Sequence, residues 1–526
     1  MKSNNEKKLE TVETNFQKLK FLEELCLKEL REKFNKAEIY LVGGAVRDFI
    51  LKREIKDFDF VIRNVEGKDL EEFLSKFGQV NLVGKTFGVL KFTPKEWAYE
   101  AIDFALPRRE HAFGTGGYRD FEVQSDPKLS VKEDLSRRDF TINAMALKIF
   151  NSGKYELVDP FNGRRDVEKK VIRAVGKPEE RFKEDYSRML RAIRFACQLD
   201  FSIEDKTRRA IFKNISHLND IRREVEMVGE TVYAEPEILE NRVVSYEVIA
   251  KEFLKSFYYS PTKAFDLYDQ SGAFRELIPE VLKLKNCPQP ENFHSEGDVW
   301  THTKLALDKL SSNEFKKQFG SERPSTELIM AVLFHDLGKP ATIKTPEKDK
   351  TDRIRFDEHD IVGAEMTKQI CERLKLSSPE NLGVDSEKVA WLVQHHMLLV
   401  QGDISKMRPS TIEKYFFNQN MPGENLLKLA FVDISATIPP DGKPDFSNFY
   451  QMIERIERLK SLSATKKELP KPLLNGYEIM EEFNLKPGPK IGQLLAALRE
   501  EQLSGRIKEK EEAIKFLQKQ MATKYE

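Results

Sequence analysis

Two aspartates separated by one residue, Asp57 and Asp59, lie near the end of the stretch YLVGGAVRDFILKREIKDFDFVIR, residues 40–63. The stretch predicts a strand, a glycine turn, a short helix and a second strand. Side chains two apart on a strand project to the same side, about 6–7 Å from each other. Like charges placed so close repel unless a cation lies between them. Because Mg²⁺ takes carboxylate, phosphate and water oxygens, the pattern favours a metal–phosphate site; a surface turn with solvated aspartates is the alternative.

Glycines and a basic residue precede these aspartates. Gly43 and Gly44 allow the backbone to approach a ligand closely, and Arg47 follows at the start of the predicted helix. A helix N-terminus with free N–H groups favours an anion such as a triphosphate. Further along, Asp103 in YEAIDF lies on a predicted strand and is the candidate third carboxylate, although a lone aspartate is more often a surface residue.

A second basic and acidic group occurs in DLSRRDFTINAMAL, residues 134–147, where Arg137, Arg138 and Asp139 are adjacent. Guanidinium groups offer forked donors that can clamp phosphate or ribose oxygens. An ion-pair cluster at the start of a helix is the structural alternative. The pattern therefore adds a candidate nucleotide contact, but it does not establish one alone.

The segment KPEERFKEDYSRMLRAIRFACQLDF, residues 177–201, predicts a long helix. Asp185 and Arg188 are three residues apart and would share a face, with Arg191 one turn further along. Such a pair is usually a surface salt bridge. It can also read a base, because a carboxylate accepts from an exocyclic amine while an arginine donates to the neighbouring ring nitrogen. Cytosine and adenine share that edge, so the pair could accept C and A and reject G and U.

In order and spacing, LVGGAVRD, DFDFV, RRDFTINAMAL, DPFNGRRD and EDYSRMLRAIRFA resemble the class II tRNA nucleotidyltransferase/poly(A) polymerase family. The resemblance implies an α+β protein: a polymerase β-like head with a small mixed sheet and helices, then all-helical neck, body, HD and tail regions. It implies Mg²⁺ on Asp57 and Asp59, with Asp103 as the third catalytic carboxylate. The nucleotide-binding residues that it implies are Gly43, Gly44, Arg47, Arg138, Asp139, Asp185, Arg188 and Arg191.

Residues 294–396 hold six of the eight histidines of the chain. Imidazoles and carboxylates on successive helices can converge on one metal. The set resembles the HD phosphohydrolase domain, which implies a site made of His302, His335, Asp336, His359, Asp433 and one of His395 and His396, with His395 taken as the ligand. We expect Ni, Mn, Co or Mg there, activating water against phosphate esters. The candidate substrates are 2′,3′-cyclic phosphates, 2′-nucleotides and phosphate at a damaged RNA end.

Length and composition limit the class of protein. At 526 residues the chain predicts several domains, and 87 basic and 87 acidic residues give no net charge that would indicate nucleic-acid binding. The four cysteines form no CxxC pair, and no apolar run or leader is long enough for a membrane or secretory segment. We therefore expect a cytoplasmic protein. The expected parts are residues 1–36 (helical extension), 37–165 (head), 166–285 (neck and body), 286–440 (HD domain) and 441–526 (RNA-binding tail).

Together these patterns predict a CCA-adding tRNA nucleotidyltransferase that uses CTP and ATP on the tRNA acceptor arm, with a second phosphohydrolase site. The close alternatives share the chemistry but not the product: an A-adding or CC-adding enzyme, or a poly(A) polymerase. An alternative of another class is an RNA-binding HD phosphohydrolase with an inactive head. The sequence gives no information on the oligomeric state.

Overall fold

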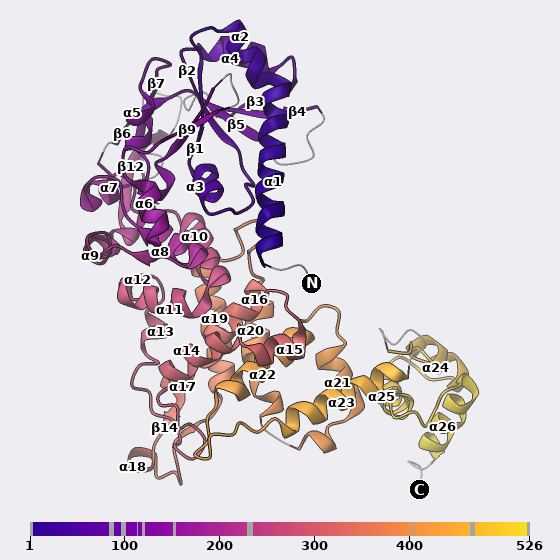
Figure 1. Ribbon diagram of the computed structural model, residues 1–526. Helices are drawn as coiled ribbons and strands as arrows, with labels where there is room; N and C mark the ends of the chain where they lie inside the picture. The colour runs from indigo at the N-terminus through magenta and orange to yellow at the C-terminus, as the bar shows by residue number, and fades with distance from the viewer. Residues whose placement is uncertain are drawn as a thin grey trace. The chain divides into compact units, whose positions relative to one another are not determined.

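The computed structural model describes residues 4–83, 89–95, 101–112, 114–117, 121–150, 154–228, 235–400, 403–462 and 469–522. The chain folds into two compact units, Met1–Leu277 and Ile278–Glu526, and each is described by itself (Figure 1). Within the described residues, no helix combines the length and the apolar character needed to cross a bilayer.

The centre of the first unit is a seven-stranded mixed sheet, which confirms the α+β prediction for the head. Only the β2–β5 pair is parallel, and the other neighbours are antiparallel. In spatial order the strands are β3 (Gly78–Val83), β4 (Val89–Pro94), β5 (Ile102–Ala105), β2 (Asp59–Arg63), β1 (Glu38–Val42), β8 (Ala146–Ile149) and β9 (Tyr155–Val158).

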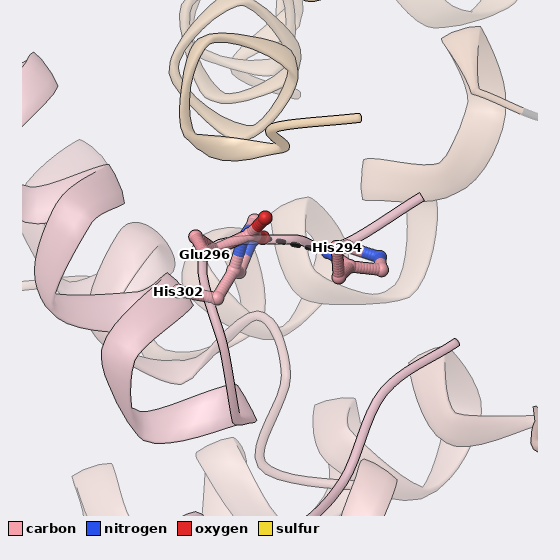
Figure 2. Close-up of side chains that lie close together, drawn as sticks. All are labelled: His294, Glu296 and His302. Carbon is pink, nitrogen blue, oxygen red and sulfur yellow. Dashed lines mark hydrogen bonds and ion pairs between the residues drawn. The ribbon is translucent and has the colours of Figure 1, made fainter. Parts of the chain in front are cut away.

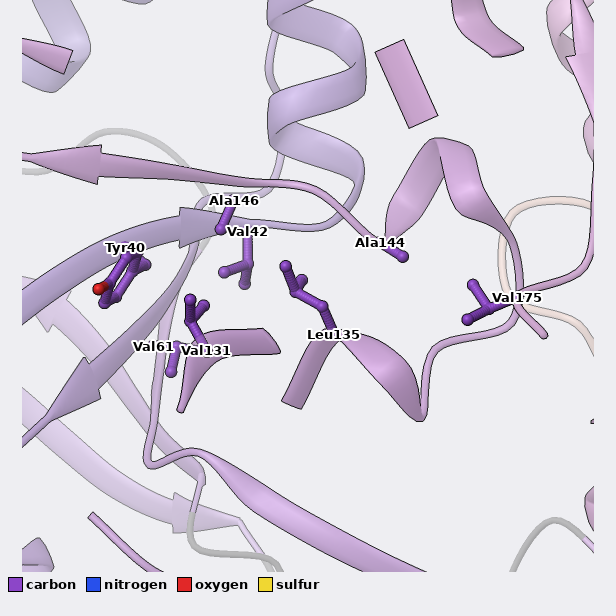
Figure 3. Packing of buried hydrophobic residues seen from close by; sticks show 8 residues of the cluster. All are labelled: Tyr40, Val42, Val61, Val131, Leu135, Ala144, Ala146 and Val175. Carbon is purple, nitrogen blue, oxygen red and sulfur yellow. The ribbon is translucent and has the colours of Figure 1, made fainter. Parts of the chain in front are cut away.

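Apolar residues at strand spacing hold this sheet to its helices. The rings of Phe60 and Phe104 stack 5.1 Å apart across the β2–β5 pair, and both are buried. A neighbouring cluster joins β1 to α5 (Val131–Ser136) and to the segment that follows it (Figure 3). The head also contains α3 (Gly44–Ile50), α4 (Gly67–Leu74), β6 (Arg108–Ala112), β7 (Phe121–Ser125), η2 (Thr141–Asn143) and α6 (Gly163–Glu168).

The N-terminal extension is helical, as predicted, and it packs on the head. It consists of α1 (Asn4–Leu22), the π-helix η1 (Glu23–Leu27) and α2 (Lys28–Lys33). The buried amide of Asn15 donates to the Arg53 carbonyl and accepts from the Ile55 N–H, at 2.8 and 2.9 Å. The extension therefore fixes the segment that leads to Asp57.

The regions after the head are mostly helical, as predicted, with short strand pairs that were not predicted. The longest pair joins β12 (Ile221–Val228) to β13 (Glu235–Arg242) in antiparallel register. The single long helix expected over 177–201 is instead two helices, α7 (Pro178–Glu184) and α8 (Ser187–Leu199). The other elements here are β10 (Val171–Ile172), β11 (Ser202–Ile203), α9 (Asp205–Asn214), η3 (Ile215–Asn219), α10 (Tyr246–Tyr259), α11 (Pro261–Gln270) and α12 (Ala273–Leu277).

The second unit is built around packed helices that carry the histidine-rich segments. These are α14 (Val299–Lys309), α16 (Thr326–Phe334), α19 (His359–Arg373), α20 (Ser386–His395) and α22 (Gly423–Ala436). Between them lie α13 (Pro279–Leu282), α15 (Asn313–Phe319), α17 (Lys339–Thr342), β14 (Ile343–Lys344), α18 (Pro346–Asp349), β15 (Arg355–Phe356), η4 (His396–Leu399), η5 (Ile404–Lys406) and α21 (Pro409–Phe416).

The unit ends in α23 (Ser447–Ser461) and a three-helix segment with its own apolar core. That segment comprises α24 (Gly476–Phe483), α25 (Pro489–Leu503) and α26 (Lys510–Ala522). Its own core makes it a small packed module rather than an extended tail.

Candidate functional site

The candidate transferase carboxylates lie where β2 and β5 run side by side. Asp59, the first residue of β2, is paired across the parallel ladder with Asp103 of β5. Asp57 lies exposed in the loop before β2. Burial raises the pKa of Asp59 to about 6, with Asp103 and Asp57 adding to the rise and Arg138 opposing it. Burial also raises the pKa of Asp103. Burial and the neighbouring carboxylates therefore disfavour the charged forms of Asp59 and Asp103, which is the electrostatic setting that a divalent cation relieves.

The glycine turn brings Arg138 over this site. Gly43 has φ +72°, and a Cβ there would lie 2.6 Å from Arg138 Nη1 and 3.6 Å from Asp59 Oδ2. The backbone angle favours glycine, whereas a Cβ here would only displace the end of the flexible Arg138 side chain. Gly44 then begins α3. The structure thus brings Gly43, Asp59 and Arg138 together, as the sequence suggested.

Arg47 is not at the start of α3 but in its fourth position, where it is buried. Its Nη1 donates to Asn143 Oδ1 at 2.7 Å, and its Nε and Nη2 donate to Asp48. The guanidinium also lies 5.4 Å from the centre of the Phe195 ring. These contacts join α3 to η2 and α8. Asn143, which the sequence reading did not assign a role, is the central partner.

Asp139, which is buried, and Arg191, which is partly exposed, form an ion pair between the head and α8. Arg191 Nη2 and Nε lie 2.7 and 3.0 Å from Asp139 Oδ2, and Asn143 donates to the other oxygen at 3.2 Å. Burial alone would raise the pKa of Asp139, but Arg191 lowers it to about 2. The carboxylate is therefore charged at neutral pH, and its ion pair connects the head to α8.

Asp185 lies in the break between α7 and α8, not on a continuous helix. Its Oδ1 accepts from the Ser187 N–H at 2.8 Å, so the carboxylate satisfies a free donor at the start of α8. The helical spacing of residues 177–201 did not predict this break, because it arises where the Asp185 carboxylate bonds the first N–H of a second helix. Burial raises the pKa of Asp185, with Ser187 and Arg188 opposing the rise.

Arg188 is buried beside Asp185, with 3.9 Å between its Nε and Asp185 Oδ2. Its Nη1 donates to Glu184 Oε2 at 2.6 Å and to the Arg181 carbonyl at 3.3 Å. Its Nη2 donates to the Arg137 carbonyl at 3.4 Å. The guanidinium is therefore held in one orientation next to the Asp185 carboxylate.

The histidine-rich segments meet in a buried cluster within the second unit. Groups close enough to hold one ion are His302, His335 and Asp336, and also Asp336, His359 and His396. Asp433 joins the first group, 2.9 Å from His302 Nε2 and 3.7 Å from His335 Nε2. The two groups share the Asp336 carboxylate. Among the residues that the structure describes, every group of three or more possible ligands that is close enough to hold one ion lies in the second unit. Asp57, Asp59 and Asp103 therefore do not form such a group.

Three histidines of the cluster are fixed by backbone carbonyls. The Nδ1 atoms of His335, His359 and His396 lie 2.8, 2.8 and 2.6 Å from the oxygens of residues 332, 356 and 393. A carbonyl only accepts, so each Nδ1 carries a proton, and each Nε2 is left as the ring atom that can face a metal at the centre. That arrangement is the one that metal-binding histidines adopt.

Several buried atoms of the cluster lack hydrogen bonds, as the ligands of a metal ion would. His335 Nε2 and both Asp336 oxygens are buried and make no hydrogen bond, although Lys339 Nζ lies 2.8 Å from Asp336 Oδ2 as an ion pair. The Nε2 atoms of His359 and His396 face each other at 3.3 Å. Unpaired buried donors and acceptors cost stability, which a bound cation removes. The residues present therefore fit a metal.

His396, not His395, belongs to this cluster. His395 is the last residue of α20, and its ring lies 4.9 Å from Trp391 and 5.0 Å from Tyr415. Consecutive residues at a helix end point about 100° apart, so only one of the pair can face the metal site. The sequence alone did not show which of His395 and His396 faces the cluster, because this depends on the residue at which α20 ends.

Gly338 allows the cluster to assemble. A Cβ at this residue would lie 2.0 Å from the His359 carbonyl oxygen and 2.8 Å from the Gly363 N. Only glycine therefore lets the start of α19 approach the His335–Asp336 turn. Lys339 follows, and its Nζ also donates to Gln289 Oε1 at 2.8 Å.

Glu296 is a residue that sequence reasoning missed. Its Oε1 lies 2.9 Å from His302 Nδ1 and 2.7 Å from His294 Nδ1 (Figure 2). Its Oε2 accepts from the Ile438 N–H. Burial would raise its pKa, but the bonds to His294, His302 and Ile438 lower it to about 2. A charged carboxylate on Nδ1 orients His302 so that Nε2 faces Asp433. Glu296 lies in the motif HSEGD, which was the available signal in the sequence. The spacing of this motif from the other ligands did not by itself indicate that Glu296 bonds His302.

Comparison with known proteins identifies the domains in which the two candidate sites lie. Three family models match the chain: the poly A polymerase head domain over residues 39–173, the HD domain over 299–430, and tRNA nucleotidyltransferase domain 2 over 450–517.

Among similar proteins, the multifunctional CCA protein of Verminephrobacter eiseniae is 33% identical over 67% of this chain and 73% of its own. The A-adding tRNA nucleotidyltransferase of Deinococcus radiodurans is 30% identical over 91% of this chain and 94% of its own.

Solved structures show the same fold at lower identity. The Bacillus stearothermophilus CCA-adding enzyme in complex with CTP is 19% identical with a TM-score of 0.57, covering 94% of this chain and 96% of that one. The Thermotoga maritima CCA-adding enzyme complexed with tRNA is 19% identical with a TM-score of 0.58, covering 96% of both chains.

A mixed-sheet head with paired strand carboxylates, followed by helices that hold an HD histidine cluster, defines an enzyme of nucleotidyl transfer with an HD domain. More narrowly, the chain belongs to the tRNA nucleotidyltransferase family.

We expect Glu296→Gln to lower the metal affinity of the HD cluster about tenfold, because the neutral amide holds His302 less firmly. The control is Glu291→Gln, which removes an exposed carboxylate from the same loop. Metal retained by each protein at a series of buffered free metal concentrations measures the effect. Equal retention by the two variants would show that Glu296 does not orient the ligand.

Proposed function

We propose that this protein rebuilds the 3′-terminal CCA of tRNA, using CTP and ATP without a nucleic-acid template. Membership of the tRNA nucleotidyltransferase family supports the proposal. The single observation that carries it is the ion pair of Asp139 with Arg191, which joins the segment that carries Arg138 to α8, the helix that carries Arg188. Metal–phosphate chemistry and base selection would then occur in one centre.

In the proposed reaction, Asp57, Asp59 and Asp103 hold Mg²⁺, which supplies charge neutralisation for the triphosphate. Gly43 lets the phosphates approach the backbone, and Arg138 and Asp139 bind the ribose side of the nucleotide. The tRNA 3′-oxygen loses its proton and bonds to the α-phosphorus, while the bond to the leaving pyrophosphate breaks. Asp185 accepts from the base amine, and Arg188 donates to the adjacent ring nitrogen.

The second unit would carry the RNA-binding surface. Its C-terminal helices, α24 to α26, match the tRNA nucleotidyltransferase domain 2 model. We propose that they bind the tRNA acceptor arm through its shape and backbone. We also propose a cytoplasmic location, since all four cysteines are buried and free, as a reducing compartment allows.

A-addition alone is the competing product. The Deinococcus radiodurans relative, which is named for A-adding, matches 91% of this chain, whereas the Verminephrobacter eiseniae CCA protein matches 67%. The Asp–Arg base edge accepts both C and A, so an enzyme that adds A alone would have to exclude C by the RNA end that it accepts or by another part of the site.

Incubation with tRNA lacking its 3′ end and each NTP, followed by sequencing of the ends, separates these products. We expect addition of C, C and A and then a stop, and we expect Asp59→Asn to abolish addition. Addition of A only to tRNA that already ends in CC would establish the A-adding alternative. A long A tail would identify a poly(A) polymerase, and no addition would favour an inactive head.

Asp185→Ala should reduce selection of C and A over G and U by tenfold or more, because the base amine loses its acceptor. Asp185→Asn is the matched variant, since its amide oxygen can still accept from the Ser187 N–H and keep the helix start. Misincorporation of each NTP is measured together with tRNA affinity. Unchanged selectivity in both variants would mean that Asp185 does not read the base.

We propose further that the HD cluster is a metal-dependent phosphohydrolase. The orphaned atoms of His335 and Asp336, and the opposed Nε2 atoms of His359 and His396, support a bound cation. The shared Asp336 carboxylate supports a two-metal arrangement, and imidazole ligands suit Ni, Mn or Co, with Mg as the alternative. Water would be the nucleophile that cleaves a phosphate ester.

His396→Ala should lose metal and phosphohydrolase activity, whereas the neighbouring His395→Ala should keep both, because only His396 faces the cluster. Metal content, hydrolysis of a phosphate ester and CCA addition are measured for each variant. We expect CCA addition to be retained in both. Loss of hydrolysis and of CCA addition together in His396→Ala would mean that the cluster serves a structural purpose.

A further inference from the structure

The segment between α3 and β2 carries Asp57, although it belongs to no helix or strand. Helix α3 ends at Ile50 and β2 begins at Asp59, and residues 53–58 lie between them without regular structure. Backbone groups in such a segment have no ladder to pair with, so their hydrogen bonds come from other parts of the chain. The place of Asp57 therefore depends on what holds this segment.

Side chains of α1 supply bonds to the backbone of this segment. The Asn15 amide donates to the Arg53 carbonyl at 2.8 Å and accepts from the Ile55 N–H at 2.9 Å. Lys18 Nζ donates to the Ile55 carbonyl at 3.3 Å and to Glu54 Oε1 at 3.2 Å. Asn15 and Lys18 are three residues apart, so they lie on one face of the helix. We call this pair the α1 clamp.

The two residues of the α1 clamp are polar yet buried. Asn15 is 1% exposed and Lys18 is 5% exposed. A buried amide or ammonium costs stability unless it is hydrogen-bonded, whereas an apolar side chain would pack there without that requirement. The Phe16 ring lies 5.4 Å from the Phe49 ring of α3, and Leu19 is buried, so apolar contact already attaches α1. The clamp therefore adds a specific hold on the backbone of residues 53–55.

Asp57 lies between the clamped backbone and a bond to the strand that carries Asp103. The side chains of Ile55 and Phe58 are buried, and the Phe58 carbonyl accepts from the Asp103 N–H at 3.0 Å. Asp57 itself is exposed, and its backbone is fixed two residues before it and one residue after it. Release of Ile55 would let Asp57 move relative to Asp59 and Asp103.

We propose that Asn15, supported by Lys18, is a positioning residue of the candidate transferase site, where it fixes the backbone that carries Asp57. The inference rests on the proposed transferase function. The match to the poly A polymerase head domain begins at residue 39, so the clamp comes from a part of the chain that precedes the matched domain. Asn15 acts only through the placement of a carboxylate, because displacing a metal-binding group by about 1 Å slows a reaction strongly.

Asn15→Leu tests the clamp, because leucine has nearly the volume of asparagine but makes no hydrogen bond. In the metal-free full chain, we expect amide hydrogen exchange in the peptide 51–58 to become about tenfold faster, with exchange in the strands of the sheet unchanged. With Mg²⁺, tRNA lacking its 3′ end and the nucleotide that the wild type incorporates, kcat per folded molecule should fall about tenfold at unchanged KM for the tRNA. The half-maximal rate should need about threefold more Mg²⁺.

Gln17→Leu is the matched control, because it removes an exposed amide from the same helix. It should change neither the exchange nor kcat. Asn15→Asp keeps an acceptor for the Ile55 N–H but loses the amide donor, so it should lie between the wild type and Asn15→Leu in both measurements. If Asn15→Leu fails to fold, the comparison of Asn15→Asp with Gln17→Leu decides.

Faster exchange with unchanged kcat would show that the clamp serves stability alone, and unchanged exchange would show that it does not hold the segment. Either result, or equal losses in Asn15→Leu and Gln17→Leu, would overturn this inference, while nucleotide addition by the wild type would leave the proposed function intact. No addition by the wild type would overturn the proposed function, and this inference with it.

Discussion

The ion pair between the buried Asp139 and the partly exposed Arg191 is the interaction on which the candidate transferase centre depends. Removing Arg191 would leave the charge of Asp139 buried without its cation, which costs stability, whereas removing Asp139 would leave an arginine that still reaches solvent. Asp139 also accepts from Asn143, and Asn143 accepts from Arg47. One network therefore connects α3, η2 and α8. The glycine turn beside Asp59 and the start of the Asp185 helix cannot move independently while these bonds hold.

The HD cluster also contains buried carboxylates, but imidazoles surround them where arginine pairs with Asp139 in the head. Asp336 and Asp433 are buried among four imidazoles, and only Lys339 brings a permanent positive charge to Asp336. Three imidazoles are turned by backbone carbonyls so that their Nε2 atoms can face the centre, and Glu296 turns the fourth. In the head, Arg191 pairs with the buried carboxylate of Asp139. In the cluster, His335 Nε2 and the Asp336 oxygens make no hydrogen bond, so they are available to bind a cation.

Sequence reasoning succeeded where chemistry follows from local periodicity. Asp59 and Asp103 were placed on strands, and the structure pairs them across β2 and β5. It failed where a helix boundary sets the direction of a side chain. Asp185 ends one helix and caps the next, and the boundary of α20 gives the inward position to His396. It also failed at Glu296, whose bond to the Ile438 N–H joins residues 142 apart in the chain. The residues near Glu296 in the sequence do not indicate a contact with a residue so far along the chain.

The rigidity of Arg188 bears on how one site serves two nucleotides. Its guanidinium is bonded to Glu184 and to the carbonyls of Arg181 and Arg137, so reorienting it would break several hydrogen bonds at once. Each such bond to a charged group contributes about 1.5–3 kcal/mol. In the proposed reaction, a switch from C to A that turned this arginine would be costly at every cycle. Cytosine and adenine present the same amine and acceptor edge, so the Asp185–Arg188 pair can stay fixed. The growing RNA end, which changes by one nucleotide at each step, is then the part that determines which base fits.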